Sequence, residues 1–474
     1  MNFVFFFPDE LRAESVGCYG NPVVRTPHLD RLAAEGTRFQ QCHVQNTVCT
    51  PSRCSLFTGL YPHVAGHRTL GHVLQTHEPS LFRYMKKAGY HIEWHGKNHV
   101  YTKPYLEEII GAAATDSVRR PDSGFQSENP FAMDDSRYYS FLYKPVAGDA
   151  RSTDTWTYVD RATQFLHSEQ AHERPFMLYV PITDPHAPYV VPEPYYSMYD
   201  PDGLPPLKPT GGDNKPSHHR LIRSCRGLDR IGDNTLETVH SVYLGMVSYV
   251  DWAFGRLMQA LDDSGLAGNT TVIVASDHGD YAGDYGLVEK WPSGMEDVLT
   301  RVPLLIRTPD GAKGHTVNEQ VELFDIMPTI MELAGIEVEH DHFAQSLLPQ
   351  LMGAHGDPNR PVFTEGGYDL RENHCHEGHP QRDAWFAENP ESIYWPKGRQ
   401  QQEHPSSVCR TAMMRTLQYK LIIRSTDTNE LYDLTQDPLE LNNVYDEPPY
   451  SDIRQHMERS LLQWYLETSD CVPR

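Results

Sequence analysis

The chain carries Asn2-Phe3-Val4-Phe5-Phe6-Phe7, an uncharged run that passes directly into Pro8-Asp9-Glu10. The run is short and lacks the basic flank of a secretion signal, so we do not interpret it as one. A short apolar run that ends at a turn residue is typical of a strand buried on both faces. We therefore predict a strand over residues 2–7, with Asp9 and Glu10 at its carboxyl end.

Further runs of the same kind follow along the chain, and between them the sequence predicts helices. Residues 26–36 carry a Thr and a Pro at the start and a Gly at the exit, and residues 241–264 place apolar side chains three and four positions apart. Strands that alternate with helices favour an α/β fold with a large, mostly parallel sheet sandwiched by helices. The further predicted strands are Tyr90–Trp94, Phe176–Pro181, Thr271–Ser276 and Val302–Arg307.

The pattern changes in the last quarter of the chain. A length of 474 residues exceeds what one ordinary core needs, and we assign residues 1–365 to the large domain. Residues 366–407 are rich in His, Glu, Pro and Gly without periodicity, which indicates a surface insertion. Residues 408–474 are predicted to form a smaller C-terminal α+β unit with an antiparallel sheet. Its expected elements are an alternating strand at 412–423, a turn at 425–429, a strand at 430–434 and a closing helix at 453–466.

Composition excludes several classes of partner. The chain has 41 Lys+Arg against 64 Asp+Glu, a net charge of −23, which disfavours nucleic acid and anionic membrane surfaces. No apolar stretch approaches the ~18 residues that span a bilayer. The eight cysteines are sparse and form no CxxC pair, so we expect neither a zinc cage nor a disulfide framework, and a cytoplasmic location. Any anionic substrate must then be attracted by a local cluster of cations.

Polar residues that can carry chemistry follow four of the predicted strands. Because the carboxyl ends of parallel strands meet at one edge of a sheet, we expect these residues to converge there. Asp9, Asp277 and His278 offer the oxygen and imidazole ligands of a divalent-cation site, although each of them alone also fits a turn or a helix cap. The polar segment 200–233 is long enough to cover such a site, and a plain surface insertion fits it equally well. The segments after the strands are Asp9-Glu10, Gly96-Lys97-Asn98-His99, Thr183–Tyr189 and Asp277-His278-Gly279-Asp280.

The segment Cys49-Thr50-Pro51-Ser52-Arg53-Cys54-Ser55-Leu56-Phe57-Thr58-Gly59 predicts a short helix that begins at Cys49 and stops at Gly59. A helix N-terminus favours negative charge. A thiolate nucleophile and a buried structural cysteine are both compatible with this placement. The phosphatase pattern with Arg six positions after the Cys is absent, because residue 55 is Ser.

Cys49-Thr50-Pro51-Ser52-Arg53 with the following Leu56 and Thr58-Gly59 resembles the signature of the type I, formylglycine-dependent sulfatases of the alkaline phosphatase superfamily. Other family segments occur in the same order over nearly the whole chain. The resemblance implies an alkaline phosphatase-like fold, with residues 1–365 as its catalytic domain. The segments are Gly17-Cys18-Tyr19-Gly20, Tyr61-Pro62-His63, Gly96–His99, Pro185–Tyr189, Ser276–Asp280, Arg301–Leu304 and Leu431–Leu434 with Asp437-Pro438 and Glu440.

The same resemblance implies hydrolysis of an aryl or alkyl sulfate, a small anionic ester, through a metal-bound formylglycine hydrate. A formylglycine-generating maturation enzyme would oxidise Cys49, and one divalent cation, Ca²⁺ or Mn²⁺, would be the cofactor. Arg53, Lys97 and Lys290 would hold the hydrate and the anion, His186 would stabilise or protonate the leaving oxygen, and His99 would accept the proton of the second hydroxyl. The implied metal ligands are Asp9, Cys49, Asp277 and His278.

Two departures from the family pattern leave alternatives open. Glu10 stands where many sulfatases have a second Asp, and His278 stands where many have Asn, as in the branch with phosphonate monoester hydrolases and choline-type sulfatases. Hydrolysis of a phosphonate monoester or a phosphodiester with the same residues is therefore the alternative function. A non-catalytic anion-binding protein, in which Cys49 stays a thiol, is the alternative of another class.

Two further features concern the C-terminal part of the chain. The histidines His374, His376 and His379 could form a second metal site, but a solvated polar insertion is expected, because their spacing does not match one helix face and no acid or cysteine partner is fixed nearby. Trp464-Tyr465-Leu466 is expected to pack against a neighbouring subunit in a homodimer or tetramer.

Overall fold

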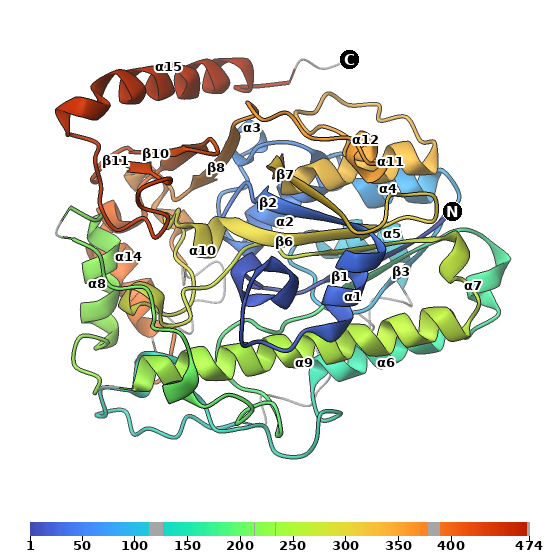
Figure 1. The fold of residues 1–474 in the computed structure, drawn as a ribbon, viewed down its shortest axis with the longest axis horizontal. Coiled ribbons are helices and arrows are strands. Elements are labelled where there is room, and N and C mark those ends of the chain that lie inside the picture. The colour runs from blue at the N-terminus through green and yellow to red at the C-terminus, as the bar shows by residue number, and fades with distance from the viewer. Residues whose placement is uncertain (113–126, 213, 233, 378–388, 472–474) are drawn as a thin grey trace.

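The computed structural model describes residues 1–112, 127–212, 214–232, 234–377 and 389–471. A seven-stranded sheet with the order β3-β4-β1-β5-β6-β2-β7 forms its centre (Figure 1). Strand β6 pairs antiparallel with both neighbours and the other pairs are parallel, so the sheet is mostly parallel as predicted. The strands are β1 (Asn2–Phe7), β2 (Thr37–His43), β3 (His91–Trp94), β4 (Phe176–Pro181), β5 (Thr270–Ala275), β6 (Arg301–Arg307) and β7 (His315–Glu322).

The five predicted strands are all present, with bounds within one residue of those expected. Strands β2 and β7 are absent from the prediction. Strand β7 forms one edge of the sheet and β2 lies next to it, and both keep several polar side chains half-exposed or exposed, such as Gln40 and Asn318. A partly solvated strand lacks the continuous apolar run of a strand buried on both faces, so its sequence does not predict it.

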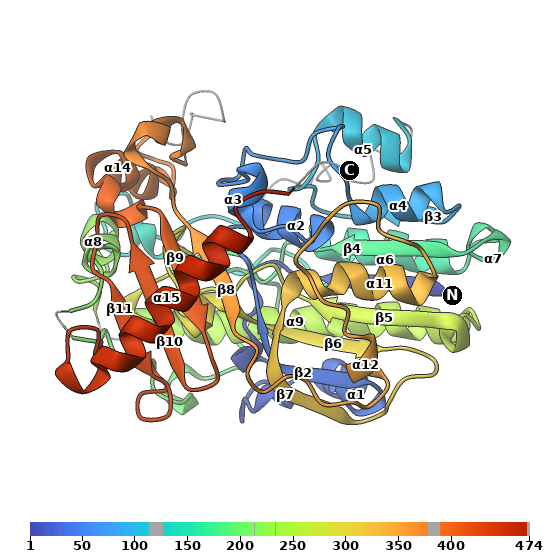
Figure 2. The same ribbon diagram turned by 90° about the horizontal axis from the view of Figure 1, so that it is seen from above.

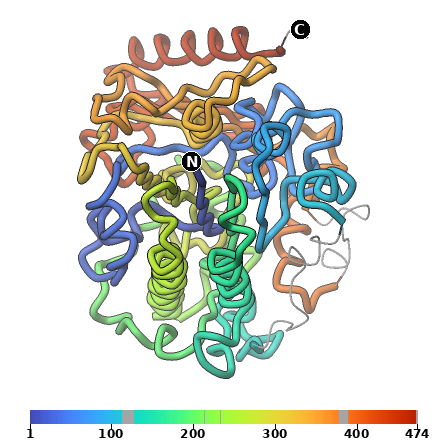
Figure 3. Tube along the Cα trace, turned by 90° about the vertical axis from the view of Figure 1, so that its right-hand side faces the viewer, coloured from blue at the N-terminus to red at the C-terminus, as the bar shows by residue number. Residues whose placement is uncertain are grey.

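Helices cover both faces of the sheet, and β1 shows how the two faces are filled. Its Val4 and Phe6 pack into one apolar cluster, and Phe3, Phe5 and Phe7 pack into the other, because successive side chains of a strand point to opposite faces. Figure 3 shows α6 and α9 side by side in the layer on one face. The first cluster contains α1 (Pro27–Glu35), α6 (Asp154–Leu166) and α9 (Thr235–Asp263), and the second contains α2 (Cys49–Thr58), α4 (Leu81–Lys87), α5 (Lys103–Ile110) and α11 (Ile326–Ala334).

The helix predicted at 241–264 is α9, which begins six residues earlier, at Thr235, and ends at Asp263. Among the helices of the described ranges, α9 included, none combines the length and the apolar content needed to cross a membrane. The remaining helices are α3 (Pro62–Ala65), α7 (Gln170–Glu173), α8 (Ser217–Arg226), α10 (Asp297–Thr300), α12 (Leu348–Leu351), α14 (Trp395–Glu403) and α15 (Ser451–Glu467).

A separate four-stranded antiparallel sheet, β11-β10-β9-β8, lies beside the large sheet, and α15 crosses over it (Figure 2). The alternation at 412–423 is not one strand, because Thr416 and Tyr419 close a tight turn between β9 and β10. Strand β8 joins this sheet, so the boundary expected at residue 365 falls inside a strand. The strands are β8 (Val362–Gly366), β9 (Thr411–Arg415), β10 (Tyr419–Arg424) and β11 (Glu430–Asp433).

The segment 366–407, predicted to be an irregular surface insertion, contains the helix α14, which packs on α8. Lys397, Gln400 and Gln401 of α14 are buried, so the prediction was wrong for this part. The reason is that its polar side chains find partners inside the protein; Lys397, for example, pairs with Glu289 and Glu377. Composition alone does not distinguish a paired buried polar residue from a solvated one.

Trp464 packs inside the chain rather than against a neighbouring subunit. Its ring stacks on Phe363 of β8 with centroids 4.5 Å apart and meets Tyr61 edge-on at 4.9 Å. Leu462 and Leu466 of α15 are exposed, at 60% and 71%. The expectation that Trp464 is buried by a partner was therefore wrong.

Candidate active site

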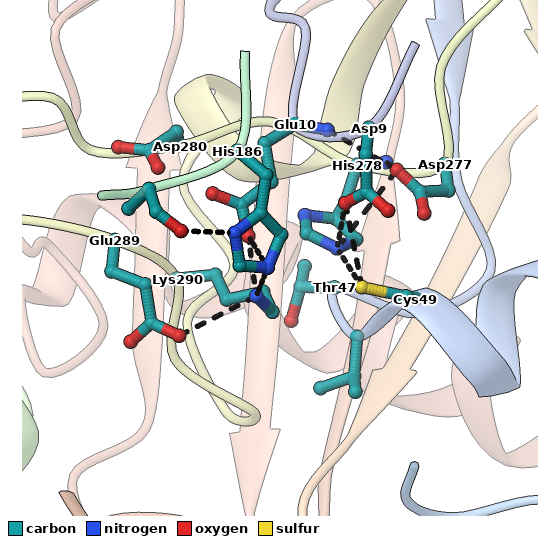
Figure 4. Close-up of polar contacts among 12 residues, drawn as sticks. Asp9, Glu10, Thr47, Cys49, His186, Asp277, His278, Asp280, Glu289 and Lys290 are labelled. Atoms are coloured by element: carbon teal, nitrogen blue, oxygen red, sulfur yellow. Dashed lines mark hydrogen bonds and ion pairs between the residues drawn. The ribbon is translucent and has the colours of Figure 1, made fainter. Parts of the chain in front are cut away.

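The carboxyl ends of β1 and β5 and the start of α2 bring four possible ligand residues together. Oxygen, nitrogen and sulfur atoms of Asp9, Cys49, Asp277 and His278 all lie within 4.8 Å of one another, and all four residues are buried. Figure 4 shows these side chains converging on one point. The four residues that the sequence assigns to a metal site thus meet in space, although Asp9 and Asp277 stand far apart in the chain.

Local contacts fix the position of this cluster. The Ser52 hydroxyl donates to the backbone carbonyl of Asp277 at 2.6 Å and ties the first turn of α2 to the end of β5. The Leu11 amide donates to the Ser276 hydroxyl at 2.9 Å, which joins the ends of β1 and β5. Gly279 permits the close approach of the next loop, since a Cβ there would lie 1.8 Å from the Val298 carbonyl oxygen. These contacts explain why small and hydroxyl residues surround the acids.

Arg53 lies between the two carboxylates. Its Nε donates to Asp277 Oδ2 and its Nη2 donates to Asp9 Oδ2, both at 2.8 Å, and its side chain is fully buried. Burial alone would raise the pKa of Asp9, but the charges of Lys97 and Arg53 outweigh it and hold that pKa well below its ordinary value. Arg53 therefore keeps Asp9 ionised and aligned with Asp277.

Two lysines border the cluster. Lys97 Nζ lies 2.5 Å from Asp9 Oδ2 and 3.7 Å from Cys49 Sγ. Lys290 Nζ donates to Glu10 and lies 3.0 Å from His186 Nε2. Burial lowers the pKa of Lys290, but the Glu10 carboxylate and other nearby groups outweigh it, so the amine stays protonated. Both lysines can therefore receive an anion.

The histidines differ in what they contact. His278 Nδ1 lies 2.8 Å from the Gly279 carbonyl oxygen, which turns Nε2 toward Cys49 Sγ, 3.2 Å away. Burial and the charge of Lys290 lower the pKa of His186 well below its ordinary value. Burial and the charge of Lys97 do the same for His99, whose Nδ1 has no hydrogen-bond partner among the described residues. The structure thus places His99 close to Lys97 but outside the four-residue cluster.

Glu10, whose role as a ligand the sequence leaves open, faces Lys290 and His186. Its Oε1 lies 3.2 Å from His186 Nε2, and its carboxylate accepts from Lys290. Burial, together with the nearby Asp280, raises the pKa of Glu10 well above its ordinary value despite Lys290. The backbone of Glu10 is in the left-handed region, with φ of 65°, and its amide donates to Asp277 Oδ1 at 3.3 Å.

Cys49 is a poor nucleophile as a thiol. It is the first residue of α2, where the helix favours an anion, yet burial raises the pKa of its thiol far above the ordinary value and the Asp9 carboxylate adds to the rise. Burial and the Asp9 carboxylate therefore raise the pKa of the thiol by more than the N-terminus of the helix lowers it. A reaction at position 49 therefore needs a different side chain or a cation that removes the proton.

The donor set fits a divalent cation. Two carboxylates and one imidazole suit Ca²⁺ or Mn²⁺, and the nitrogen shifts the preference toward the softer Mn²⁺. Arg53 holds the outer oxygens of both carboxylates, which is the usual arrangement around metal-binding acids.

Sequence reasoning missed a set of charged side chains behind Lys290. Glu289 Oε1 lies 3.4 Å from Lys290 Nζ and 2.8 Å from Lys397 Nζ, and Arg226 Nη2 reaches Glu289 Oε2 at 3.3 Å. Arg226 is on α8 and Lys397 is on α14, within the two segments read as polar loops. The sequence does not indicate that Arg226 and Lys397 are buried, because lysines and arginines in polar segments are usually solvated.

Comparisons with known proteins identify the family. The family model "Sulfatase" matches residues 1–336, and the model "N-sulphoglucosamine sulphohydrolase, C-terminal" matches residues 391–467. The uncharacterised sulfatase YidJ of Escherichia coli is 29% identical over 99% of this chain and 88% of its own, and the arylsulfatase of Clostridium perfringens is 25% identical over 90% and 95%. The solved phosphonate monoester hydrolase of Agrobacterium radiobacter shares the fold, with a TM-score of 0.76 and 22% identity over 98% and 96%. The chain belongs to the sulfatase family and is a sulfuric ester hydrolase.

Proposed function

We propose that the protein hydrolyses sulfate monoesters, aryl or alkyl, at the cluster around Cys49. One observation carries the proposal: the side chain at position 49 begins a helix, faces two carboxylates and an imidazole, and has Lys97 within 3.7 Å. This arrangement offers a place for a nucleophile, a cation and the oxygens of a tetrahedral anion. The net charge of −23 makes such local cations necessary for an anionic substrate.

The protein groups have separable tasks. Asp9, Asp277 and His278, with the side chain at position 49, would hold one divalent cation, which would neutralise substrate charge and lower the pKa of a coordinated hydroxyl. Lys97 and Lys290 would bind the sulfate oxygens where charge develops. Arg53 bonds to both acids through Nε and Nη2 and would align them, and its Nη1, which has no partner among the described residues, would hold the hydrate and the anion.

Two histidines would donate or accept protons during the reaction. His186 lies 3.0 Å from the Lys290 amine, so the pair would stabilise or protonate the oxygen of the departing alcohol. His99 has a depressed pKa and is neutral at neutral pH, as a base must be. We assign it the proton of a second hydroxyl at position 49.

That second hydroxyl requires a modified residue. We propose that a formylglycine-generating maturation enzyme oxidises Cys49 to the aldehyde formylglycine, whose hydrate carries two hydroxyls on one carbon. The hydrate would supply one hydroxyl as the nucleophile for sulfur and a second hydroxyl whose proton His99 would accept. The raised pKa of the Cys49 thiol supports this proposal, since the unmodified side chain is a weak nucleophile.

Hydrolysis of a phosphonate monoester or a phosphodiester is the alternative. The presence of His278 at 3.2 Å from Cys49 Sγ, in place of an amide oxygen, favours a softer metal and gives this alternative its support. The lysines would accept either tetrahedral anion.

The two reactions are separated by steady-state kinetics on protein whose aldehyde content has been measured. Our proposal expects a higher kcat/KM for an aryl sulfate than for an aryl phosphonate monoester with the same leaving group. A preference for the phosphonate would replace the proposed function with the alternative. The Cys49→Ala variant should lose turnover of both substrates and keep its fold, as judged by circular dichroism; wild-type activity in it would exclude both.

The cellular setting is also a proposal. None of the eight cysteines, all within the described residues, is in a disulfide, which supports a reducing cytoplasm. Exposed Leu462 and Leu466 on α15 support a homodimer or tetramer in which this helix is covered.

A further inference from the structure

A second group of metal-binding atoms lies outside the cluster around Cys49. Ligand atoms of His72, His374 and Cys375 lie within 4.8 Å of one another. His72 precedes α4, in the loop that follows α3, and the other two end the 3-10 helix Leu370–Cys375. The rings of His72 and His374 meet edge-on, with centroids 6.1 Å apart. Two segments separated by about three hundred residues of chain therefore present three donor atoms to one point.

The backbone holds His72 in place. Its carbonyl oxygen lies 2.6 Å from His67 Nδ1 and accepts from the Cys54 thiol at 3.8 Å, so the loop is fastened to α2. The Arg68 amide donates to His72 Nδ1 at 3.3 Å, which orients the ring. Coordination of an ion through Nε2 would move the ring proton to Nδ1 and replace this bond, whereas the contacts of the His72 carbonyl oxygen would remain.

The other side of the group is also fixed. Asp369 and Glu372 cap the 3-10 helix reciprocally: the Asp369 side chain accepts from the Arg371 amide at 2.9 Å, and the Asp369 amide donates to Glu372 Oε2 at 2.7 Å. Cys375 is 1% exposed, whereas His374 is exposed. The backbone that carries His374 and Cys375 is thus held at its start, and one side of the group stays open to solvent.

The chemistry of the donors selects the ion. Two imidazoles and one thiolate are soft to borderline ligands, which favour Zn²⁺ over the Ca²⁺ or Mn²⁺ that suits carboxylates. Three protein ligands leave a fourth tetrahedral position for water. A metal site at His374, His376 and His379 is not expected from the sequence, because no acid or cysteine partner is fixed nearby. His379 lies outside the described residues, and the structure pairs His374 with Cys375 and His72 instead.

We propose that His72, His374 and Cys375 form a Zn²⁺ site that fastens the segment 370–377 to the loop on α2. On binding, the Cys375 thiol releases its proton to solvent and the resulting thiolate donates an electron pair to the ion. Two residues after Cys375, Glu377 pairs with Lys397 at 2.8 Å, and Lys397 pairs with Glu289 next to Lys290. The site therefore anchors a segment that reaches the surroundings of the catalytic lysine.

Cobalt titration of the full-length Cys49→Ser variant tests the site directly. Cys49→Ser removes the thiol from the active-site cluster, so a thiolate-to-cobalt charge-transfer band in the near ultraviolet can come only from another cysteine. We expect one such band, which saturates at one equivalent above the active-site metal and disappears on addition of Zn²⁺. Absence of the band at saturating Co²⁺ would overturn the proposal.

Further substitutions in the same background assign the ligands. Cys375→Ser should abolish the band, and His374→Ala and His72→Ala should weaken Co²⁺ binding at least about tenfold, as expected for loss of a metal ligand. His77→Ala, an exposed histidine of the same loop, and Cys225→Ser, a half-buried cysteine on α8, should leave the band unchanged. A band that survives Cys375→Ser would contradict the assignment. If Cys375→Ser does not fold, His374→Ala decides, because that side chain is exposed and its loss should not affect folding.

Discussion

Arg53 connects two acids that are far apart in the chain. Its guanidinium donates hydrogen bonds of 2.8 Å to Asp9, which follows β1, and to Asp277, which follows β5, and so holds the two carboxylates together. Without a counter-charge, two buried carboxylates this close would repel, and one would take up a proton. The low pKa of Asp9 shows that Arg53, with Lys97, prevents this. The charge of one buried arginine thereby prepares the cluster to bind a cation.

Asp277→Asn should weaken metal binding at least about tenfold, because the amide keeps the shape of the side chain and loses its charge. The measurement is the metal content of dialysed protein by mass spectrometry, at a series of free Mn²⁺ concentrations. Asp184→Asn is the matched control, since Asp184 is close to the end of β4, bonds to Thr155 at 2.5 Å and lies outside the donor cluster. Equal metal content in the wild type and Asp277→Asn would remove Asp277 from the ligands.

At the scale of the elements, a side chain of α9 caps the N-terminus of α1. Asp251 of α9 accepts from the Leu29 amide at 2.8 Å and from the His28 amide at 3.1 Å, which are orphan donors in the first turn of α1. Burial raises the pKa of Asp251 to about 7, against the opposing effect of the two amides. A helix cap that is also a buried acid makes the packing of α1 on α9 sensitive to pH.

The sign of this effect follows from the two protonation states. The folded protein keeps the Asp251 proton up to about pH 7, whereas the unfolded chain releases it near pH 4, so stability falls as the pH rises from 4 to 7. Relative to Asp251→Asn, which has no such proton, the wild type should lose about 3 kcal/mol between pH 5 and 8. Urea unfolding of both proteins at these two pH values measures the difference. Parallel pH profiles would show that Asp251 titrates normally.

Helix α14 connects the segment 366–407 to the active site. Lys397→Met should reduce kcat about tenfold with little change in KM, because Glu289 would then draw the Lys290 amine away from Glu10 and His186. Lys397→Arg should restore part of the activity. Lys208→Met is the control, since Lys208 forms an ion pair with Glu14 elsewhere. A loss of stability with an unchanged kcat would make Lys397 purely structural.

The sequence predicts some helices and strands of this fold and not others. A central strand buried on both faces, such as β1, is visible as an apolar run, and Asp9 and Asp277 are identified because each follows one. The strands β2 and β7 and the buried helix α14 are not visible in the sequence, since their polar side chains look solvated until their partners are known. For the same reason the sequence does not predict that Lys397 and Arg226 are buried near Lys290. Long-range ion pairs depend on tertiary structure, which one-dimensional patterns do not contain.

At the scale of the molecule, the two sheets are joined by buried ion pairs. Lys420 of β10 lies 2.6 Å from Asp297 Oδ1 on α10 and donates to the Met295 carbonyl oxygen at 3.0 Å. Arg415 of β9 contacts Asp297 Oδ2 at 3.0 Å. The carboxyl ends of the large sheet therefore rest against the small sheet (Figure 2), and we expect the whole chain to unfold as one unit.

Lys420→Met should lower the free energy of unfolding by about 3–5 kcal/mol, since it leaves Asp297 and Glu440 buried with less counter-charge. Lys103→Met, which removes an exposed lysine on α5, should change it by less than about 0.5 kcal/mol. Urea denaturation followed by tryptophan fluorescence and circular dichroism gives both values. Two separate transitions in the wild type would contradict the view that the sheets fold together.

The central claim is that position 49 carries an aldehyde in the working enzyme. Mass spectrometry of the peptide that contains residue 49, on preparations of different specific activity, tests it most directly. We predict that kcat per mole of protein rises in proportion to the fraction of peptide in which –CHO replaces –CH₂SH. Full activity in a preparation that contains only the unmodified cysteine would contradict the claim.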